Sequence, residues 1–133
     1  MSIFISFISS HLYSTIFFLK IYFLIPSSSI TIFSHNNKIK IITLAPEECE
    51  DNVYQTMKEL NIVASAGHTN ASANDIKNAT KHGLTMTTHT YNAMRGIHHR
   101  EIGTVGAALL YDNLACELIC DLHHVSEDAI RLL

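Results

Sequence analysis

Two histidines are the residues best suited to chemistry, because each follows small or hydroxylated residues and precedes a polar stretch. His68 stands in the run SAGHTNA (65–71), and His89 stands in the run THTYNAM (88–94). Each run is typical of a strand that ends in a loop, and a strand end holds an imidazole rigidly. Neutral imidazole is the commonest protein metal ligand. The pair predicts a metal site, whereas a single histidine of this kind more often binds a neighbouring loop.

Two other side chains are candidates for contacts with a substrate. Arg100, in the run HHRE (98–101), could bind an anionic group such as phosphate or carboxylate. A surface ion pair between Arg100 and Glu101 is the alternative. His124 could contact substrate or transfer a proton, and its alternative is a hydrogen bond to Asp121.

From residue 38 onward, the hydrophobic pattern predicts strands that alternate with helices. The expected strands cover 38–44, 62–66, 84–88 and 115–120. The expected helices cover 48–60, 70–82, 105–110 and 127–133, with a cap at Asn70 or Ser72, a second cap at Ser126 and a long loop over 92–103. Alternation at this spacing indicates parallel βαβ units, hence an α/β fold.

The carboxyl ends of parallel strands meet at one edge of a sheet, where sites usually form. We call this edge the rim. Its expected polar residues are Glu47, His68, His89, Asn92, Asp121, His123 and His124.

The chain length limits how much of a closed fold is present. A complete (β/α)8 barrel of the TIM type needs about 250 residues, and this chain has 133. About four consecutive βα units, a partial barrel, is the expected architecture. Four open strands would leave two unpaired edges, so we expect marginal stability and a tendency to aggregate.

Residues 1–36 differ from the rest in composition. The stretch 3–25 is almost wholly Ile, Phe, Leu, Tyr and Ser, interrupted by His11 and Lys20. It is long enough to cross a bilayer, although a lysine near the bilayer centre costs about 2.5–3.5 kcal/mol. We interpret 1–36 as an apolar low-complexity segment unrelated to the fold. It is either a membrane anchor or translated sequence foreign to the protein, the latter favoured because AT-rich DNA encodes these residues by default. A role in the fold is disfavoured because no turn signals interrupt it.

Composition restricts the remaining possibilities. A formal net charge of −3 gives no indication of nucleic-acid binding. Cys49, Cys116 and Cys120 form no paired framework, so we expect free buried thiols in a reducing compartment. Seven of the nine histidines fall between His68 and His124, which favours a site over scattered surface residues.

Five runs together resemble the N-acetylglucosamine-6-phosphate deacetylases, a family within the metal-dependent amidohydrolases. The runs are TLAPE (43–47), SAGHTNA (65–71), THTYNAM (88–94), HREIG (99–103) and DLHHV (121–125). They occur in the family's order and at its spacing, over residues 39–133. The resemblance implies that 37–133 is a fragment of an amidohydrolase barrel.

The family hydrolyses the acetamide of N-acetylglucosamine 6-phosphate to glucosamine 6-phosphate and acetate. The resemblance implies that His68 and His89 bind one divalent metal ion, with zinc, iron and manganese all open. It assigns substrate contacts to Asn92, Ala93, Arg100 and His124. It also implies a cytoplasmic protein, with membrane anchoring through 3–25 as the alternative, and a homodimer for the intact enzyme.

The chain departs from the family's pattern in several places. Residues 1–38 contain neither the family's early His-x-His motif nor its His-Leu-Glu-Gly-Pro motif, whose glutamate binds metal. The family's acid–base aspartate, in a Thr-Asp-Ala run, would lie beyond Leu133, so no catalytic residue is assigned and we expect this chain alone to be inactive. Glu47 belongs to a different strand from the ligand glutamate and takes no metal role. Asp121-Leu122-His123 replaces the usual Asp-Gly-hydrophobic step.

Two alternatives remain. One is a related amidohydrolase with a different N-acyl or ring-amide substrate. The other is a membrane-tethered remnant that binds metal or sugar phosphate without catalysis.

Overall fold

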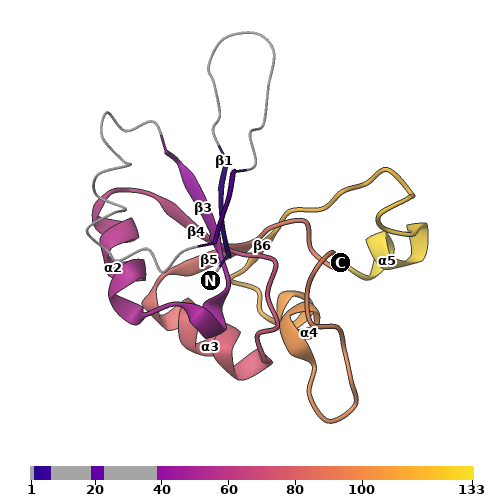
Figure 1. Cartoon of the computed structure of the whole chain (residues 1–133). Coiled ribbons are helices and arrows are strands. Elements are labelled where there is room, and N and C mark those ends of the chain that lie inside the picture. Colours follow the sequence, from indigo (N-terminus) through magenta and orange to yellow (C-terminus); the bar gives the residue numbers. More distant parts are fainter. Residues whose placement is uncertain (1, 7–18, 23–38) are drawn as a thin grey trace, which may run out of the picture.

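The computed structural model describes residues 2–6, 19–22 and 39–133. It is a mixed α/β structure with one sheet and flanking helices (Figure 1). The strands are β1 (Ser2–Ser6), β2 (Leu19–Tyr22), β3 (Ile41–Leu44), β4 (Val63–Ala66), β5 (Leu84–Thr87) and β6 (Ala115–Cys116). The helices are the 3-10 turn η1 (Pro46–Glu48), α2 (Asp51–Glu59), α3 (Ala73–His82), α4 (Gly103–Leu110) and α5 (Glu127–Leu132).

The sheet has the order β2-β1-β3-β4-β5-β6, and β3 to β6 run parallel to one another. Ile41 pairs with Val63, and Leu44 pairs with Ala66. Helix α3 contacts both α2 and α4 and packs on β5, so the helices lie in chain order along the sheet. The four parallel strands in sequence order confirm the expected α/β class.

The N-terminal strands differ from the expectation that the segment before residue 37 is unrelated to the fold. Strand β1 runs antiparallel to both β2 and β3, with Phe4 opposite Thr43. Pairing at a sheet edge uses main-chain groups, so an apolar segment without turn signals can supply it. Strand β1 therefore covers the β3 edge, and the two end strands of the described sheet are β2 and β6.

No helix among the described residues is long and apolar enough to cross a membrane. Most of the proposed anchor 3–25, as well as His11 and His35, lies outside the described residues.

The last strand is shorter than its pattern predicts. The sequence indicated 115–120, yet β6 comprises Ala115 and Cys116 alone. Glu117 still exchanges main-chain hydrogen bonds with the β5 chain, to Thr87 at 2.9 Å and from Thr90 at 2.7 Å. Beyond this point β5 has already turned away into its loop, so 118–120 has no strand beside it to continue the ladder.

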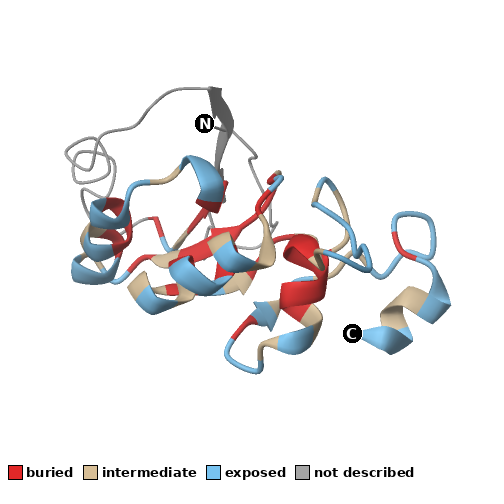
Figure 2. Cartoon of the chain, turned by 90° about the horizontal axis from the view of Figure 1, so that it is seen from below, coloured by how far each residue is buried: buried red, intermediate tan, exposed pale blue. Residues whose placement is uncertain are grey.

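The core lies between the sheet and the inner faces of α2, α3 and α4, whereas α5 is largely exposed (Figure 2). Leu44, Met57, Ile76 and Leu84 are among its most buried side chains. Ser72 starts α3 through a reciprocal cap with Asp75, and Gly83 ends the helix at a φ of 126°. Serine at the start of a helix and glycine at its end are the residue types generally preferred there.

Candidate functional site at the rim

The structure brings the two sequence-predicted metal histidines together. His68 follows β4 and His89 follows β5, after Gly67 and Thr88 respectively. Their ring centroids lie 4.7 Å apart, with an edge-to-face angle of 82°. Both residues have positive φ, 49° at His68 and 38° at His89. That backbone region is uncommon for residues other than glycine, so the surrounding loops must hold both histidines in place.

The loops after β4 and β5 are joined by main-chain hydrogen bonds. The Thr69 N–H donates to the carbonyl of Ala93 at 3.0 Å, and the Arg95 N–H donates to the carbonyl of Thr69 at 3.2 Å. These bonds form a parallel bridge between Thr69 and Met94. The two histidine-bearing loops therefore behave as one unit.

A buried hydroxyl cluster lies at the strand ends that carry the histidines. The Thr88 hydroxyl contacts the hydroxyl of Thr43 at 2.8 Å and that of Ser65 at 2.6 Å. All three residues are buried. A methyl group at Gly67 would come within 2.7 Å of Thr43 and 3.1 Å of Thr88, so the backbone approaches closely here.

Sequence reasoning missed this hydroxyl cluster. Its signal was a hydroxylated residue within one position of the end of each of β3, β4 and β5.

The carboxylate of Glu47 is hydrogen-bonded to the loop after β4. It accepts hydrogen bonds from the Thr69 hydroxyl and from the Asn70 main-chain N–H, the latter at 2.6 Å. Both oxygens of this carboxylate therefore accept hydrogen bonds from one loop.

Asn92 lies against His89 and carries an unmet hydrogen-bonding group. The Nδ1 of His89 is 3.1 Å from the Asn92 carbonyl oxygen. Since a carbonyl only accepts, Nδ1 carries a proton, and in the neutral ring the other nitrogen then keeps its lone pair. The Asn92 side-chain amide nitrogen is buried and has no hydrogen-bond partner among the described residues. A buried donor in this state needs an acceptor that the described residues do not supply, such as a water molecule or a ligand.

Arg100 does not form the surface pair with Glu101 that was its alternative. Glu101 instead pairs with Arg95 at 2.9 Å and accepts hydrogen bonds from the N–H groups of Ala73 and Gly103. These bonds hold the pKa of Glu101 below its usual value. Arg100 is exposed in the turn between His98 and Glu101, whose main chains exchange two hydrogen bonds of 3.0 Å.

His124 pairs with Asp121, as its alternative interpretation predicted. Its Nδ1 lies 2.6 Å from one Asp121 oxygen, and the other oxygen accepts from the main chains of His123 and His124. These bonds, chiefly those from His124, lower the pKa of Asp121 to about 2. Both side chains are exposed, so the imidazole is open to solvent on a short ordered turn.

The metal expectation fits the residues in part. His68 and His89 are close enough to serve one ion, and the tautomer of His89 leaves a ring nitrogen for ligation. Within the described residues, no group of three or more His, Cys, Asp or Glu side chains could hold a metal. The described part of the chain therefore offers a two-histidine half-site.

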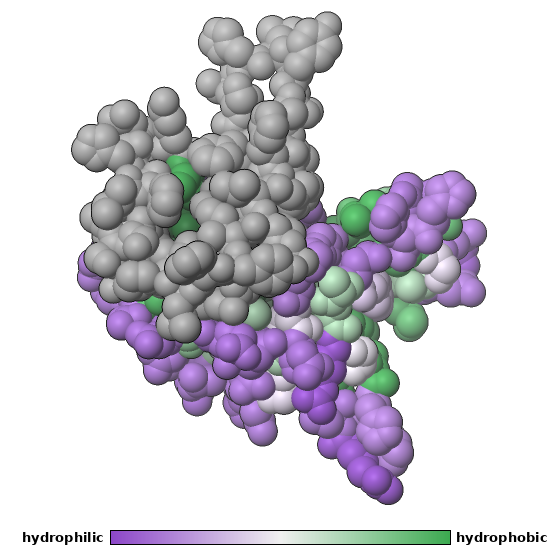
Figure 3. Space-filling view, viewed as in Figure 1, coloured by the Kyte–Doolittle hydropathy of each residue, from purple (hydrophilic) through white to green (hydrophobic). Residues whose placement is uncertain are grey.

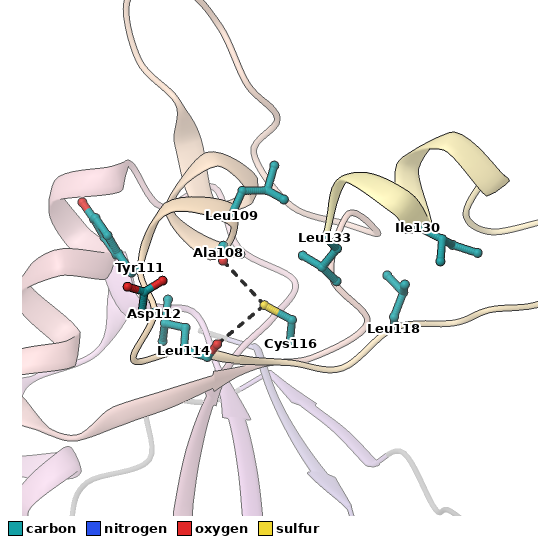
Figure 4. Close-up of a pocket in the computed structure, with 9 residues that line it drawn as sticks. All are labelled: Ala108, Leu109, Tyr111, Asp112, Leu114, Cys116, Leu118, Ile130 and Leu133. Atoms are coloured by element: carbon teal, nitrogen blue, oxygen red, sulfur yellow. Dashed lines mark hydrogen bonds between the residues drawn. The ribbon is translucent and has the colours of Figure 1, made fainter.

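The cysteines are free, as expected, but they are less buried than expected. Cys49 and Cys116 are half-buried, and Cys120 is exposed. The Cys116 thiol lies beside the carbonyls of Ala108 and Leu114, at 3.7 and 3.8 Å (Figure 4).

That thiol lines a groove of about 450 Å³ between α4, β6 and α5 (Figure 4). Leu109, Leu118 and Ile130 line it, and no rim histidine does. Hydrophobic residues also reach the surface around α4 and α5 (Figure 3). The groove is therefore separate from the candidate site.

The fold and rim define a protein of βα units with paired histidines at its strand ends, an arrangement suited to binding a metal ion. The N-acetylglucosamine-6-phosphate deacetylase of Lysinibacillus sphaericus is 42% identical over 96 residues, 71% of this chain and 25% of the relative. The enzyme of that name from Bacillus subtilis is 44% identical over 95 residues, 71% of this chain and 24% of the relative.

A solved structure agrees with these relatives. The crystal structure of N-acetylglucosamine-6-phosphate deacetylase from Pasteurella multocida matches with a TM-score of 0.74 and 33% identity, over 82% of this chain and 29% of that one. No family model matches the chain. The matched relatives and the solved structure are N-acetylglucosamine-6-phosphate deacetylases, and the chain corresponds to a fragment of that family. The chain spans about a quarter of the length of the curated relatives it matches.

Proposed function

We propose that this chain supplies the histidine half of the metal site, and the sugar-phosphate contacts, of an N-acetylglucosamine-6-phosphate deacetylase. The edge-to-face pair of His68 and His89 carries the proposal. The pair stands at the rim of a segment that is over 40% identical to deacetylases. In this reading residues 37–133 are four βα units of a larger (β/α)8 barrel.

His68 and His89 would hold one divalent ion, which is zinc, iron or manganese. When bound, such an ion polarises the amide carbonyl and activates water. His89 donates its Nδ1 proton to the Asn92 carbonyl, which fixes the ring for ligation through its other nitrogen. Two imidazoles alone leave the ion weakly held, and we expect no hydrolysis by these residues by themselves.

The substrate's phosphate is assigned to the loop that follows His89. The buried amide nitrogen of Asn92 needs an acceptor oxygen, and the main chain of Ala93 lies next to it at a φ of 50°. Arg100, exposed and without the Glu101 pair, is available for a charge-assisted bond to phosphate. His124, oriented by Asp121, is assigned to the sugar and its acyl group.

A chimaera tests this function directly. The aligned 95-residue stretch of the B. subtilis relative would be replaced by the matching stretch of this chain. We expect acetate release from N-acetylglucosamine 6-phosphate, lowered about 100-fold or more by His68→Asn or His89→Asn, since a metal supplies several kcal/mol of transition-state stabilisation. His82→Asn, outside the rim, is the matched control.

The other candidate residues give graded outcomes in the same chimaera. Arg100→Ala should raise KM for the phosphorylated sugar with little change in kcat. A chimaera that folds by circular dichroism but releases no acetate would contradict the proposal. Activity confined to another N-acyl substrate would favour the related amidohydrolase instead.

A further inference from the structure

Glu47 is a rim residue to which neither the sequence nor the proposed function gives a role. It lies in η1, the turn that follows β3, and it is exposed. Its carboxylate nevertheless spans to the loop after β4, where one oxygen accepts from the Thr69 hydroxyl and the other from the Asn70 N–H. An exposed glutamate with both oxygens bound to one loop is more constrained than a solvated surface charge.

Thr69 connects this carboxylate to the second histidine loop. It is 6% exposed, and its hydroxyl also accepts from the Ala71 N–H at 3.0 Å. Its main chain bonds to Ala93 and Arg95, in the loop after His89. A single residue therefore joins the loops after β3, β4 and β5, and Glu47 holds it from the β3 side.

His68 immediately precedes Thr69 and has a φ of 49°. A non-glycine residue keeps such a backbone only when its surroundings hold it there. On its C-terminal side those surroundings are Thr69 and Asn70, the two residues that Glu47 binds.

We propose that Glu47 is a positioning residue that holds His68 beside His89. Its importance for metal binding rests on the proposed function. Glu47 would act through Thr69 and Asn70, without touching the metal or the substrate. Its charged oxygens make both bonds stronger than neutral acceptors would. A glutamine at 47 has a single carbonyl oxygen and no charge, so it can accept from only one of the two donors that Glu47 accepts from.

The neighbouring Glu48 provides a matched control. It lies in the same 3-10 turn and is likewise exposed, and Glu48→Gln removes the same charge. The full chain would be compared as wild type, Glu47→Gln and Glu48→Gln. In the metal-free protein, the nuclear Overhauser effect between the ring protons of His68 and His89 reports their 4.7 Å separation.

We expect this ring contact to weaken in Glu47→Gln and to stay unchanged in Glu48→Gln, while both variants keep the wild-type circular dichroism. Zn²⁺ affinity should fall about 10-fold to 100-fold in Glu47→Gln alone, as for other residues that orient metal ligands. An equal ring contact in all three proteins would overturn the inference.

A second pair of variants covers the case in which Glu47→Gln fails to fold. Thr69→Val removes the hydroxyl that donates a hydrogen bond to Glu47, and Thr69→Ser keeps that hydroxyl. We expect the histidine contact to be lost in the valine variant and restored in the serine variant. A retained contact in Thr69→Val would overturn the inference.

The two proposals can fail separately. The ring contact is measured without metal, so it decides the role of Glu47 even if the wild-type protein binds no Zn²⁺. Absence of Zn²⁺ binding at His68 and His89 would count against the proposed function alone.

Discussion

His68 and His89 belong to successive βα units, yet their rings lie edge to face with centroids 4.7 Å apart. Zinc–imidazole bonds are about 2.0–2.1 Å long, so two rings at this separation can approach one ion. The contact depends on three levels of structure. Parallel pairing of β4 with β5 sets the strand ends side by side, positive φ turns each histidine at its strand end, and the Thr69–Met94 bridge joins the two loops.

The hydroxyl cluster beneath the rim should contribute to stability. Thr88→Val keeps the side-chain shape but removes the hydroxyl that lies between Thr43 and Ser65. Two buried hydroxyls would lose this partner, so we expect the free energy of unfolding to fall by about 1–3 kcal/mol in urea titrations. Thr85→Val, at an exposed position of β5, should change it by less than about 0.5 kcal/mol. Equal stability of the two variants would contradict a structural role for the cluster.

The caps of α3 and α5 should differ in their energetic importance. Ser72 and Asp75 form a reciprocal cap at a helix that packs Ile76 and Ala79 into the core. Ser126 caps α5, none of whose residues is buried. We expect Ser72→Ala to lower the free energy of unfolding by about 1 kcal/mol and Ser126→Ala to change it little. A larger effect at Ser126 would show that α5 contributes more to folding than its burial indicates.

Much of the parallel part of this fold follows from the sequence, because β3 to β5 and α3 have clear hydrophobic patterns and clear end signals. The capping serine and the terminal glycine of α3 were both visible as residue types. The pairing of β1 with β3 could not be predicted from the sequence, since edge pairing uses main-chain groups that carry no side-chain signature.

The candidate site was predictable as a set of residues but not as a set of contacts. His68 and His89 stood out because each ends a strand. A pair with Glu101 was the alternative interpretation of Arg100 because the two residues are adjacent, yet Glu101 pairs with Arg95 across a turn. Such pairings depend on the tertiary path of a loop, which local sequence does not determine.

The thiol of Cys49 should be unreactive until the solution is strongly alkaline. Burial raises its pKa from 9.0 to about 11, and the thiolate is the reactive form. Alkylation at about pH 8, followed residue by residue with mass spectrometry, should modify the exposed Cys120 well before Cys49. Equal rates at the two cysteines would contradict the burial of Cys49.

The same raised pKa has a consequence for stability. The folded protein favours the protonated form of the Cys49 thiol. The stability that depends on this protonated thiol is fully present below pH 9.0 and is lost as the pH rises through about 11. Denaturation at alkaline pH should therefore be delayed in Cys49→Ala, provided that the substitution leaves the neutral-pH stability similar.

The most direct test of the two-histidine metal site is a Zn²⁺ titration of the whole chain with residue-resolved ¹⁵N spectra of the imidazole rings. We predict that the unprotonated ring nitrogens of His68 and His89 shift together along one binding curve, with Nδ1 of His89 remaining protonated by its bond to Asn92. His82, outside the rim, should not respond on that curve. Zn²⁺ binding at the adjacent His98 and His99 with no response from His68 and His89 would contradict the account.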